Sequence, residues 1–159
     1  MYWLLCSREA YNSGMTNEEP RKVTHYYVGI YLIGADGRII GQQRDDKPGI
    51  DNPGRIASFG GTVEPGEDMP AAVRRELSEE TNLDVARLEI VPYFTDTAWR
   101  KLTSEWEERH FFYAKLSAEA VAGLEVYEGQ GWQYIPSADD PRLVDGWRDP
   151  LRMLLDALQ

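Results

Sequence analysis

The sequence predicts an α+β fold in which a mixed β-sheet lies between helices. Three observations predict it: runs of β-branched and aromatic residues at 26–33 and 108–116, a helical pattern between them at 71–80, and an amphipathic helical pattern at 151–159. Strands interrupted by single helices are typical of one layered domain. The chain of 159 residues has no internal repeat, so we expect one domain.

The first predicted elements are a β-hairpin and a loop. The apolar run at 26–33 stops at the turn sequence ADG and resumes at Ile39, a pattern typical of two antiparallel strands. Residues 45–55 contain two Pro-Gly dipeptides and are predicted to form a loop. The short apolar segment at 56–61 is predicted to be a strand that ends in two glycines.

A helix is predicted to begin after Asp68 and to continue to Glu80. Asp68 is a favourable N-cap, Pro70 is acceptable in the first turn, and residues 71–80 are mostly strong helix formers. Asparagine tolerates the left-handed backbone conformation, so we expect Asn82 to end the helix.

The second half of the chain is predicted to complete the sheet and to add a terminal helix. Segments 88–99 and 108–116 read as an antiparallel pair, and a last strand follows a glycine-rich bend at 128–136. Asp149 and Pro150 are expected to begin the terminal helix. Its apolar face is predicted to consist of Leu151, Leu154, Leu155 and Leu158.

Residues 1–22 are predicted to be a leader to a domain at 23–159. Two alternatives stay open for this leader: a flexible segment, or a short added strand formed by the opening YWLL. The single cysteine, Cys6, cannot form an internal disulfide, which is typical of a reducing compartment. The sequence has neither a secretory signal pattern nor the roughly 18 consecutive apolar residues of a membrane span. We therefore expect a cytoplasmic protein without membrane contact.

The charge of the chain restricts its partners. The formal net charge is −10 and the sequence pI is near 4.7. Binding of a nucleic acid polymer needs clustered Lys and Arg, so we expect no such partner. A small phosphate ligand stays compatible with an acidic protein, because a bound metal ion can offset the charge of its phosphates.

The predicted helix at 71–80 carries three glutamates on one side. Glu76, Glu79 and Glu80 are spaced so that a helix directs them to one region, although their charges repel. Mg²⁺ and Mn²⁺ prefer such hard oxygen ligands, and an ion would relieve the repulsion. The alternative is a solvent-exposed helix face on which Arg75 pairs with Glu79. The glycine-rich entry FGG favours metal binding, because glycines let the backbone approach a ligand.

The segment that begins at Gly61 resembles the Nudix box. Gly61, five residues, Glu67, seven residues and then RELSEE followed by TNL match the signature of hydrolases of nucleoside diphosphates linked to another moiety. Asn82 stands where the family usually has glycine, and Phe59 stands where proline is commoner. The downstream segment EGQ is similar to one in nucleoside-triphosphate members, and it places Glu128 at the metal. The likeness covers roughly residues 23–158.

The resemblance implies a Nudix-type α/β/α sandwich with a mixed β-sheet, the box helix and the C-terminal helix. It also implies a magnesium-dependent site, with Mn²⁺ as the other candidate ion. The expected cation ligands are the Gly60 carbonyl, Glu76, Glu79, Glu80 and Glu128. Among the catalytic glutamates Glu76, Glu79 and Glu80, the resemblance makes Glu76 either a ligand or the general base. Gly61, Glu67 and Arg75 are expected to be structural, with Arg75 paired to Glu67.

The expected function is hydrolysis of a diphosphate bond in a small-molecule nucleotide. The short chain and the EGQ segment favour a nucleoside triphosphate, oxidised ones included, as the substrate of a nucleoside triphosphate pyrophosphohydrolase-like member. Three cations in or beside the 45–55 loop could receive its phosphates: Arg44, Lys47 and Arg55. The alternatives are a nucleotide-sugar or ADP-ribose pyrophosphatase, a non-catalytic nucleotide-sensing module, and an enzyme acting on RNA 5′ ends, which the net charge disfavours. A homodimer is left open.

Overall fold

The computed structural model describes residues 21–159. The predictions for Cys6 and for the leader up to residue 20 lie outside the described residues. Within them, the strands are β1 (Val23–Ile33), β2 (Ile39–Gln43), β3 (Ile56–Ala57), β4 (Phe59–Thr62), β5 (Val91–Arg100), β6 (Glu105–Lys115) and β7 (Gly131–Ile135). The helices are α1 (Met69–Glu80), α2 (Ala118–Ala122) and α3 (Arg148–Ala157), and 3-10 turns occur at Val85–Arg87 and Asp145–Trp147.

The seven strands form one mixed sheet around β1. β1 pairs with β6 in parallel, whereas every other strand pairing in the sheet is antiparallel. The predicted hairpin is confirmed by the β1–β2 pairing, and the predicted antiparallel pair in the second half is confirmed by β5 and β6. The segment predicted as one strand at 56–61 forms two, because β3 pairs with β2 whereas β4 pairs with β1.

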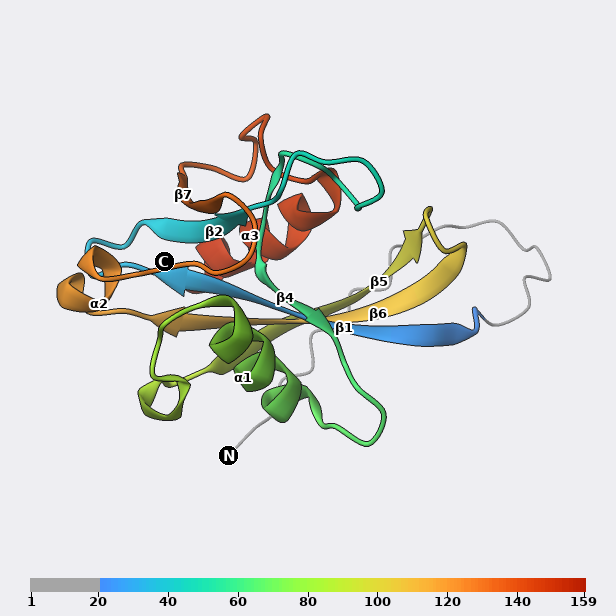
Figure 1. Ribbon diagram of the computed structural model, residues 1–159, viewed down its shortest axis with the longest axis horizontal. Coiled ribbons are helices and arrows are strands. Elements are labelled where there is room, and N and C mark those ends of the chain that lie inside the picture. Colours follow the sequence, from blue (N-terminus) through green and yellow to red (C-terminus); the bar gives the residue numbers. More distant parts are fainter. Residues whose placement is uncertain (1–20) are drawn as a thin grey trace.

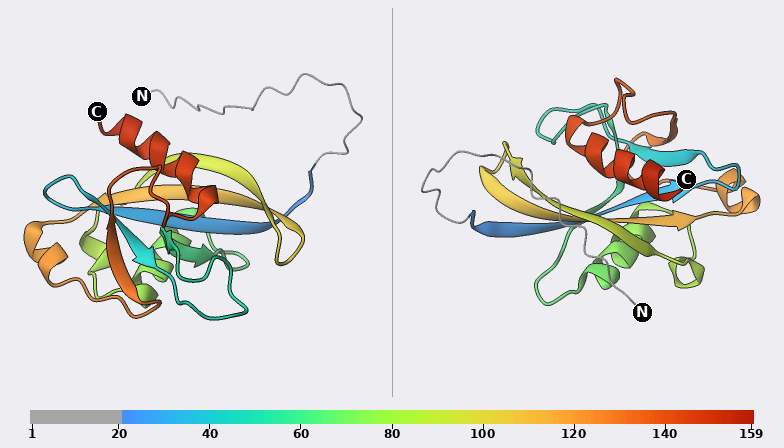
Figure 2. Two further views of the ribbon diagram at one scale, coloured as in Figure 1. Left: turned by 90° about the horizontal axis from the view of Figure 1, so that it is seen from above. Right: turned by 180° about the vertical axis from the view of Figure 1, so that it is seen from behind.

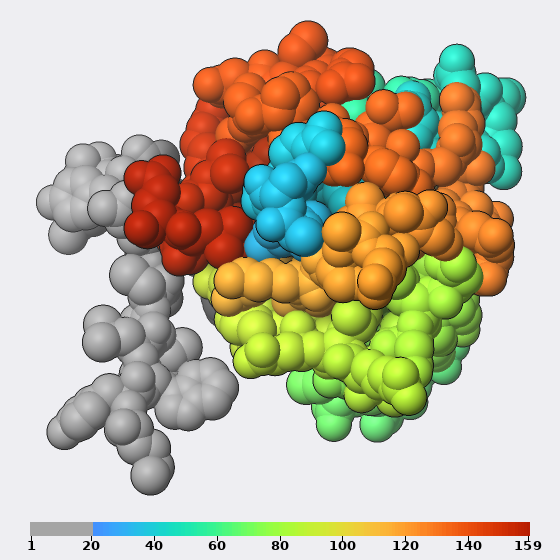
Figure 3. Space-filling view, turned by 90° about the vertical axis from the view of Figure 1, so that its left-hand side faces the viewer, coloured from blue at the N-terminus to red at the C-terminus, as the bar shows by residue number. Residues whose placement is uncertain are grey.

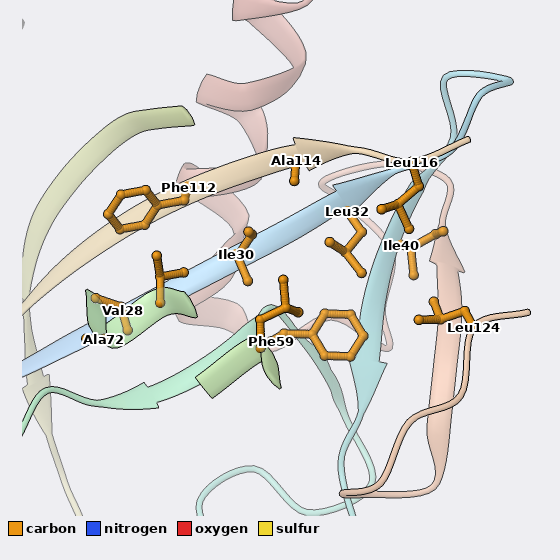
Figure 4. Close-up of a cluster of buried hydrophobic side chains, with 12 residues drawn as sticks. Val28, Ile30, Leu32, Ile40, Phe59, Ala72, Phe112, Ala114, Leu116 and Leu124 are labelled. Carbon is orange, nitrogen blue, oxygen red and sulfur yellow. The ribbon is translucent and has the colours of Figure 1, made fainter. Parts of the chain in front are cut away.

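Helices cover both faces of the sheet, as the sequence predicts. Figure 1 shows α1 on one face and α3 on the other, and the rear view in Figure 2 shows α3 lying across its face. The buried cluster on the α1 side includes Val28, Phe59 and Leu77, and Figure 4 shows its side chains meeting between β1, β4 and β6. The cluster on the other side includes Leu151 and Leu154.

α1 begins after Asp68 and ends at Glu80, as predicted, but its C-terminal cap differs from the prediction. Asp68 caps the helix by accepting a hydrogen bond from the Ala71 amide at 2.8 Å. The prediction that Asn82 ends the helix in a left-handed conformation is wrong, because Thr81 is the C-cap and its backbone is extended. Thr81 instead forms a β-bridge with Val126, which draws the chain out of the helix toward the 123–130 segment.

The terminal helix begins earlier than predicted. α3 starts at Arg148, Trp147 is its N-cap without a side-chain hydrogen bond, and Asp149 lies in the first turn. Leu151 and Leu154 are buried as predicted, whereas Leu158 follows the helix and is 37% exposed. No helix within residues 21–159 combines the length and apolar composition that crossing a bilayer requires.

One end of the molecule brings together segments that are far apart in the sequence. Figure 3 shows the turn between β1 and β2, in blue, beside α2 in orange and the segment after α1 in yellow-green. The Asn82 amide group donates to the Gly123 carbonyl at 2.7 Å, and its oxygen accepts from the Glu125 amide at 3.0 Å. Asn82 therefore joins the end of α1 to the segment that leads to Glu128.

Candidate active site

Glu80, the last residue of α1, is a buried carboxylate between two strands. It is 3% exposed. One carboxylate oxygen accepts the Gly60 amide of β4 at 2.9 Å, and the other accepts the Gln42 side-chain amide of β2 at 3.2 Å. β2 and β4 both pair with β1, and each supplies one hydrogen-bond donor to Glu80 at the end of α1. The fold thus places a glutamate where a core residue would ordinarily stand.

The electrostatics of Glu80 favour a neutral carboxyl or a bound cation. Burial raises the pKa of Glu80 to about 8, and the neighbouring charges of Glu128 and Glu76 act in the same direction. The hydrogen bonds from Gly60 and Gln42 oppose this shift without cancelling it. A positive ion beside the carboxylate would therefore stabilise its charged form.

The two glycines of β4 lie too close to neighbouring atoms for a side chain to fit. Gly60 has φ of +133°, and a β-carbon there would lie 1.9 Å from the Val28 carbonyl oxygen. A β-carbon on Gly61 would lie 2.6 Å from the carboxylate atoms of Glu76. A side chain at position 61 would therefore collide with Glu76.

Arg75 organises the outer glutamates of the site. Its guanidinium donates to both Glu67 oxygens at 2.9 Å, so the predicted Arg75–Glu67 pair is present. It also donates to Glu76 at 2.8 Å and to Glu79 at 3.4 Å. The Arg75–Glu79 pair is the one expected for a solvent-exposed helix face, whereas the contact with Glu76 was not predicted. The Arg75 Nη2 atom, which donates to Glu67, also donates to the Thr62 carbonyl at 3.0 Å, so the side chain links α1 to the end of β4.

Main-chain hydrogen bonds hold the segment with Glu128 against α1. The Tyr127 amide donates to the Glu80 carbonyl at 2.7 Å, and the Gln130 amide donates to the Gln43 carbonyl at 2.8 Å. The Gln42 side chain, which contacts Glu80, also donates to the Glu128 carbonyl at 3.4 Å. Glu128, 48 positions after Glu80 in the sequence, therefore stands beside it in the fold.

A hollow of about 160 Å³ lies next to Glu128. Arg44 and Lys47 line it together with Gln42, so two of the three predicted phosphate-binding cations are at the site. The structure does not bring Arg55 there, because its guanidinium donates to the Leu143 carbonyl at 2.6 Å. The lining also includes Asp45, whose carboxylate pairs with Lys47 at 2.9 Å, so the hollow holds two cations and two carboxylates.

The predicted convergence of three carboxylates on one point is not present in this arrangement. Within residues 21–159, no three acidic, histidine or cysteine side chains are grouped tightly enough to hold a metal ion as they stand. Glu80 faces inward, whereas Glu76 and Glu79 face Arg75. The donors still fit Mg²⁺ or Mn²⁺ chemically, because a buried carboxylate flanked by two others lacks a compensating charge. The Glu79 side chain is 57% exposed and pairs with Arg75 at 3.4 Å.

Gln42 contacts Glu80, although the sequence did not predict it as a site residue. Gln42 lies on the same face of β2 as the buried Ile40. A polar residue at an alternating apolar position of a predicted strand is the sequence feature that could have indicated its role. Trp99 of β5 and Trp106 of β6 pack edge to face, with their ring centroids 5.4 Å apart.

The chain is similar to several known proteins. The family description "NUDIX domain" matches residues 23–152. An RNA pyrophosphohydrolase from Roseobacter denitrificans is 29% identical over 165 residues, which cover 91% of this chain and 98% of that protein. The nucleoside triphosphatase NudI from Escherichia coli is 33% identical over 92 residues, which cover 57% of this chain and 64% of NudI.

Solved structures share the fold. An Ap4A hydrolase from C. elegans superimposes with a TM-score of 0.69 at 22% identity, covering 85% of this chain and 98% of that one. The MutT protein of Methanosarcina mazei gives a TM-score of 0.66 at 21% identity, covering 89% of this chain and all of that one.

Proposed function

Since the chain belongs to the Nudix family of hydrolases, we propose that it hydrolyses the diphosphate bond of a nucleoside triphosphate, oxidised ones included, to a nucleoside monophosphate and pyrophosphate. The observation that carries the proposal is Glu80, a buried carboxylate between Gly60 and Gln42. Its position beside a hollow with two cations suits a substrate whose phosphates need both a metal ion and positive side chains.

In the proposed reaction, a water molecule attacks one phosphorus in line with the leaving oxygen. A bound Mg²⁺ would neutralise charge on the phosphate oxygens, and its ligands would be Glu80, Glu79, Glu128 and the Gly60 carbonyl. Glu76 takes the proton of the attacking water. Burial raises the pKa of Glu76, which brings it closer to the value that a general base needs near neutral pH. Arg44 and Lys47 orient the phosphates from the hollow.

The test is Glu80→Gln, assayed for Mg²⁺-dependent release of monophosphate and pyrophosphate. Because the amide cannot carry the negative charge, we expect activity to fall by about a hundredfold or more. Glu89→Gln is the matched control, since Glu89 is an exposed glutamate in the segment after α1. Unchanged turnover by a folded Glu80→Gln protein would remove Glu80 from the mechanism.

A second candidate is removal of pyrophosphate from RNA 5′ ends. The relative from Roseobacter denitrificans, matched over nearly its whole length, favours it by name. The net charge of −10 argues against it, because RNA binding needs clustered cations. A substrate panel of nucleoside triphosphates, nucleotide sugars, ADP-ribose and 5′-triphosphate RNA, with products identified by mass, separates the candidates. A non-catalytic sensing module would turn over none of them. The proposal includes a cytoplasmic location, which the single cysteine favours.

A further inference from the structure

Gln42 is a buried amide among apolar side chains. It is 4% exposed and lies on the α1 face of β2, two residues after Ile40. Ile40 packs in the buried cluster that contains Phe59 and Leu77, and Figure 4 shows Ile40 and Phe59 in that cluster. On the neighbouring strand β7, the residue opposite Gln42 is Trp132, which packs against the same cluster. Because burying an amide is costly unless its polar atoms are hydrogen-bonded, such a position ordinarily holds an apolar residue.

The two N–H groups of the Gln42 amide join two parts of the proposed cation site. The Nε2 atom donates to a Glu80 carboxylate oxygen at 3.2 Å and to the Glu128 carbonyl at 3.4 Å. A side-chain amide nitrogen carries two hydrogens, so both donors are in use. The opposite orientation of the amide would place its oxygen against two acceptors, so these contacts fix the orientation. One side chain of β2 therefore connects the end of α1 with the segment before β7.

The Glu80 carboxylate is held at both oxygens and can still bind a cation. The Gly60 amide donates to one oxygen at 2.9 Å, and Gln42 donates to the other. Each carboxylate oxygen has two lone pairs, so a single hydrogen bond to each leaves further capacity. The two donors therefore fix the orientation of the carboxylate without exhausting its ability to bind a metal ion.

The contact with Glu128 adds a hydrogen bond at that residue itself. The main-chain hydrogen bonds of this segment come from the amides of Tyr127 and Gln130, on either side of Glu128. The Gln42 side chain contacts the Glu128 carbonyl between them. Loss of the Gln42 donors would therefore loosen both Glu80 and Glu128, while the main-chain hydrogen bonds stay in place.

We propose, on the basis of the proposed nucleotide hydrolysis, that Gln42 is a positioning residue that holds Glu80 and Glu128 at the separation a divalent cation requires. In this role it touches neither the cation nor the reacting atoms. Groups that orient metal ligands typically contribute about ten- to a hundredfold to metal affinity. Gln42 also lines the hollow next to Glu128, so direct contact with the substrate is the alternative role. Only the positioning role predicts an effect on cation binding in the absence of nucleotide.

The test is Gln42→Met, which keeps the length of the side chain and removes both donors. Calorimetric titration without nucleotide should show that the variant binds Mn²⁺ at least about tenfold more weakly than the unmodified protein. Gln43→Met is the matched control, because the side chain of Gln43, the next residue of β2, donates to the Gly54 carbonyl at 3.2 Å. We expect this control to bind Mn²⁺ like the unmodified protein.

A folded Gln42→Met protein that binds Mn²⁺ as tightly as the unmodified protein would overturn the proposal, even if it bound nucleotides more weakly. An equal loss of Mn²⁺ affinity in Gln43→Met would overturn it as well, because the loss would then come from a general disturbance of β2. So would an unmodified protein that binds no Mn²⁺. Thermal melts in EDTA verify that the variants are folded, and Gln42→Leu takes the place of a Gln42→Met protein that does not fold.

The Mn²⁺ dependence of turnover gives a second readout. We expect Gln42→Met to need at least about tenfold more Mn²⁺ for half-maximal hydrolysis, but to reach a kcat within about threefold of the unmodified protein at saturating Mn²⁺. A lower kcat with unchanged Mn²⁺ dependence would contradict the positioning role. If Mn²⁺ binding weakens as expected but no nucleoside triphosphate is hydrolysed by the unmodified protein, the proposed function fails and Gln42 keeps its role.

Discussion

At the scale of single residues, the burial of Glu80 makes the stability of the metal-free protein depend on pH. Its folded-state pKa of about 8 lies above the ordinary value of 4.5, so the folded protein binds the proton more tightly than the unfolded chain. The stabilisation is fully present below the ordinary pKa and is lost as the pH rises toward the folded value. Burial raises the pKa values of Glu76 and Glu107 as well, which adds to the same trend.

We therefore expect the melting temperature in EDTA to fall between about pH 5 and pH 8, and Glu80→Gln to show a smaller fall. The amide cannot titrate and carries no buried charge at high pH. Adding Mg²⁺ at pH 8 should raise the melting temperature of the unmodified protein more than that of the variant. Differential scanning calorimetry across this pH range measures both effects, and identical pH profiles for the two proteins would argue against a titrating Glu80.

At the scale of elements, the end of α1 is fixed by Asn82. Its side chain forms two hydrogen bonds to the segment before Glu128, at 2.7 and 3.0 Å. Asn82→Gly would restore the residue usual in the family, yet we expect it to lower the free energy of unfolding by about 1–3 kcal/mol, because both bonds are lost. Asn52→Gly is the control: Asn52 is exposed with φ of 51°, where glycine is well tolerated. Urea titrations measure both, and equal stability of the two variants would contradict the role of Asn82.

The sequence predicted those features of the fold that depend on residues close together in the chain. The Asp68 cap, the hairpin around the ADG turn and the apolar face with Leu151 and Leu154 all depend on neighbouring residues. The failures depend on distant contacts: the pairing of Thr81 with Val126 decides how α1 ends. The site followed the same rule, since the motif indicated Glu80 whereas Gln42 and the Arg75 contacts to Glu76 required the fold.

At the scale of the whole molecule, the fold concentrates negative charge that its own cations do not fully balance. The chain carries 27 acidic and 17 basic side chains, and three of the acidic ones, at 76, 80 and 128, act on one another around the end of α1. Hydrogen bonds from β2, β4 and the segment before β7 hold these groups together at the end of α1. A divalent cation is the ligand that such an arrangement would bind most favourably.

Calorimetric titration of Mn²⁺ into the unmodified protein and Glu80→Gln tests this most directly. We expect the unmodified protein to bind Mn²⁺ and to release protons at pH 7, and the variant to bind with an affinity at least about tenfold lower. Glu89→Gln should bind like the unmodified protein. An unmodified protein that takes up no Mn²⁺, or a Glu80→Gln protein that binds it equally well, would contradict the account.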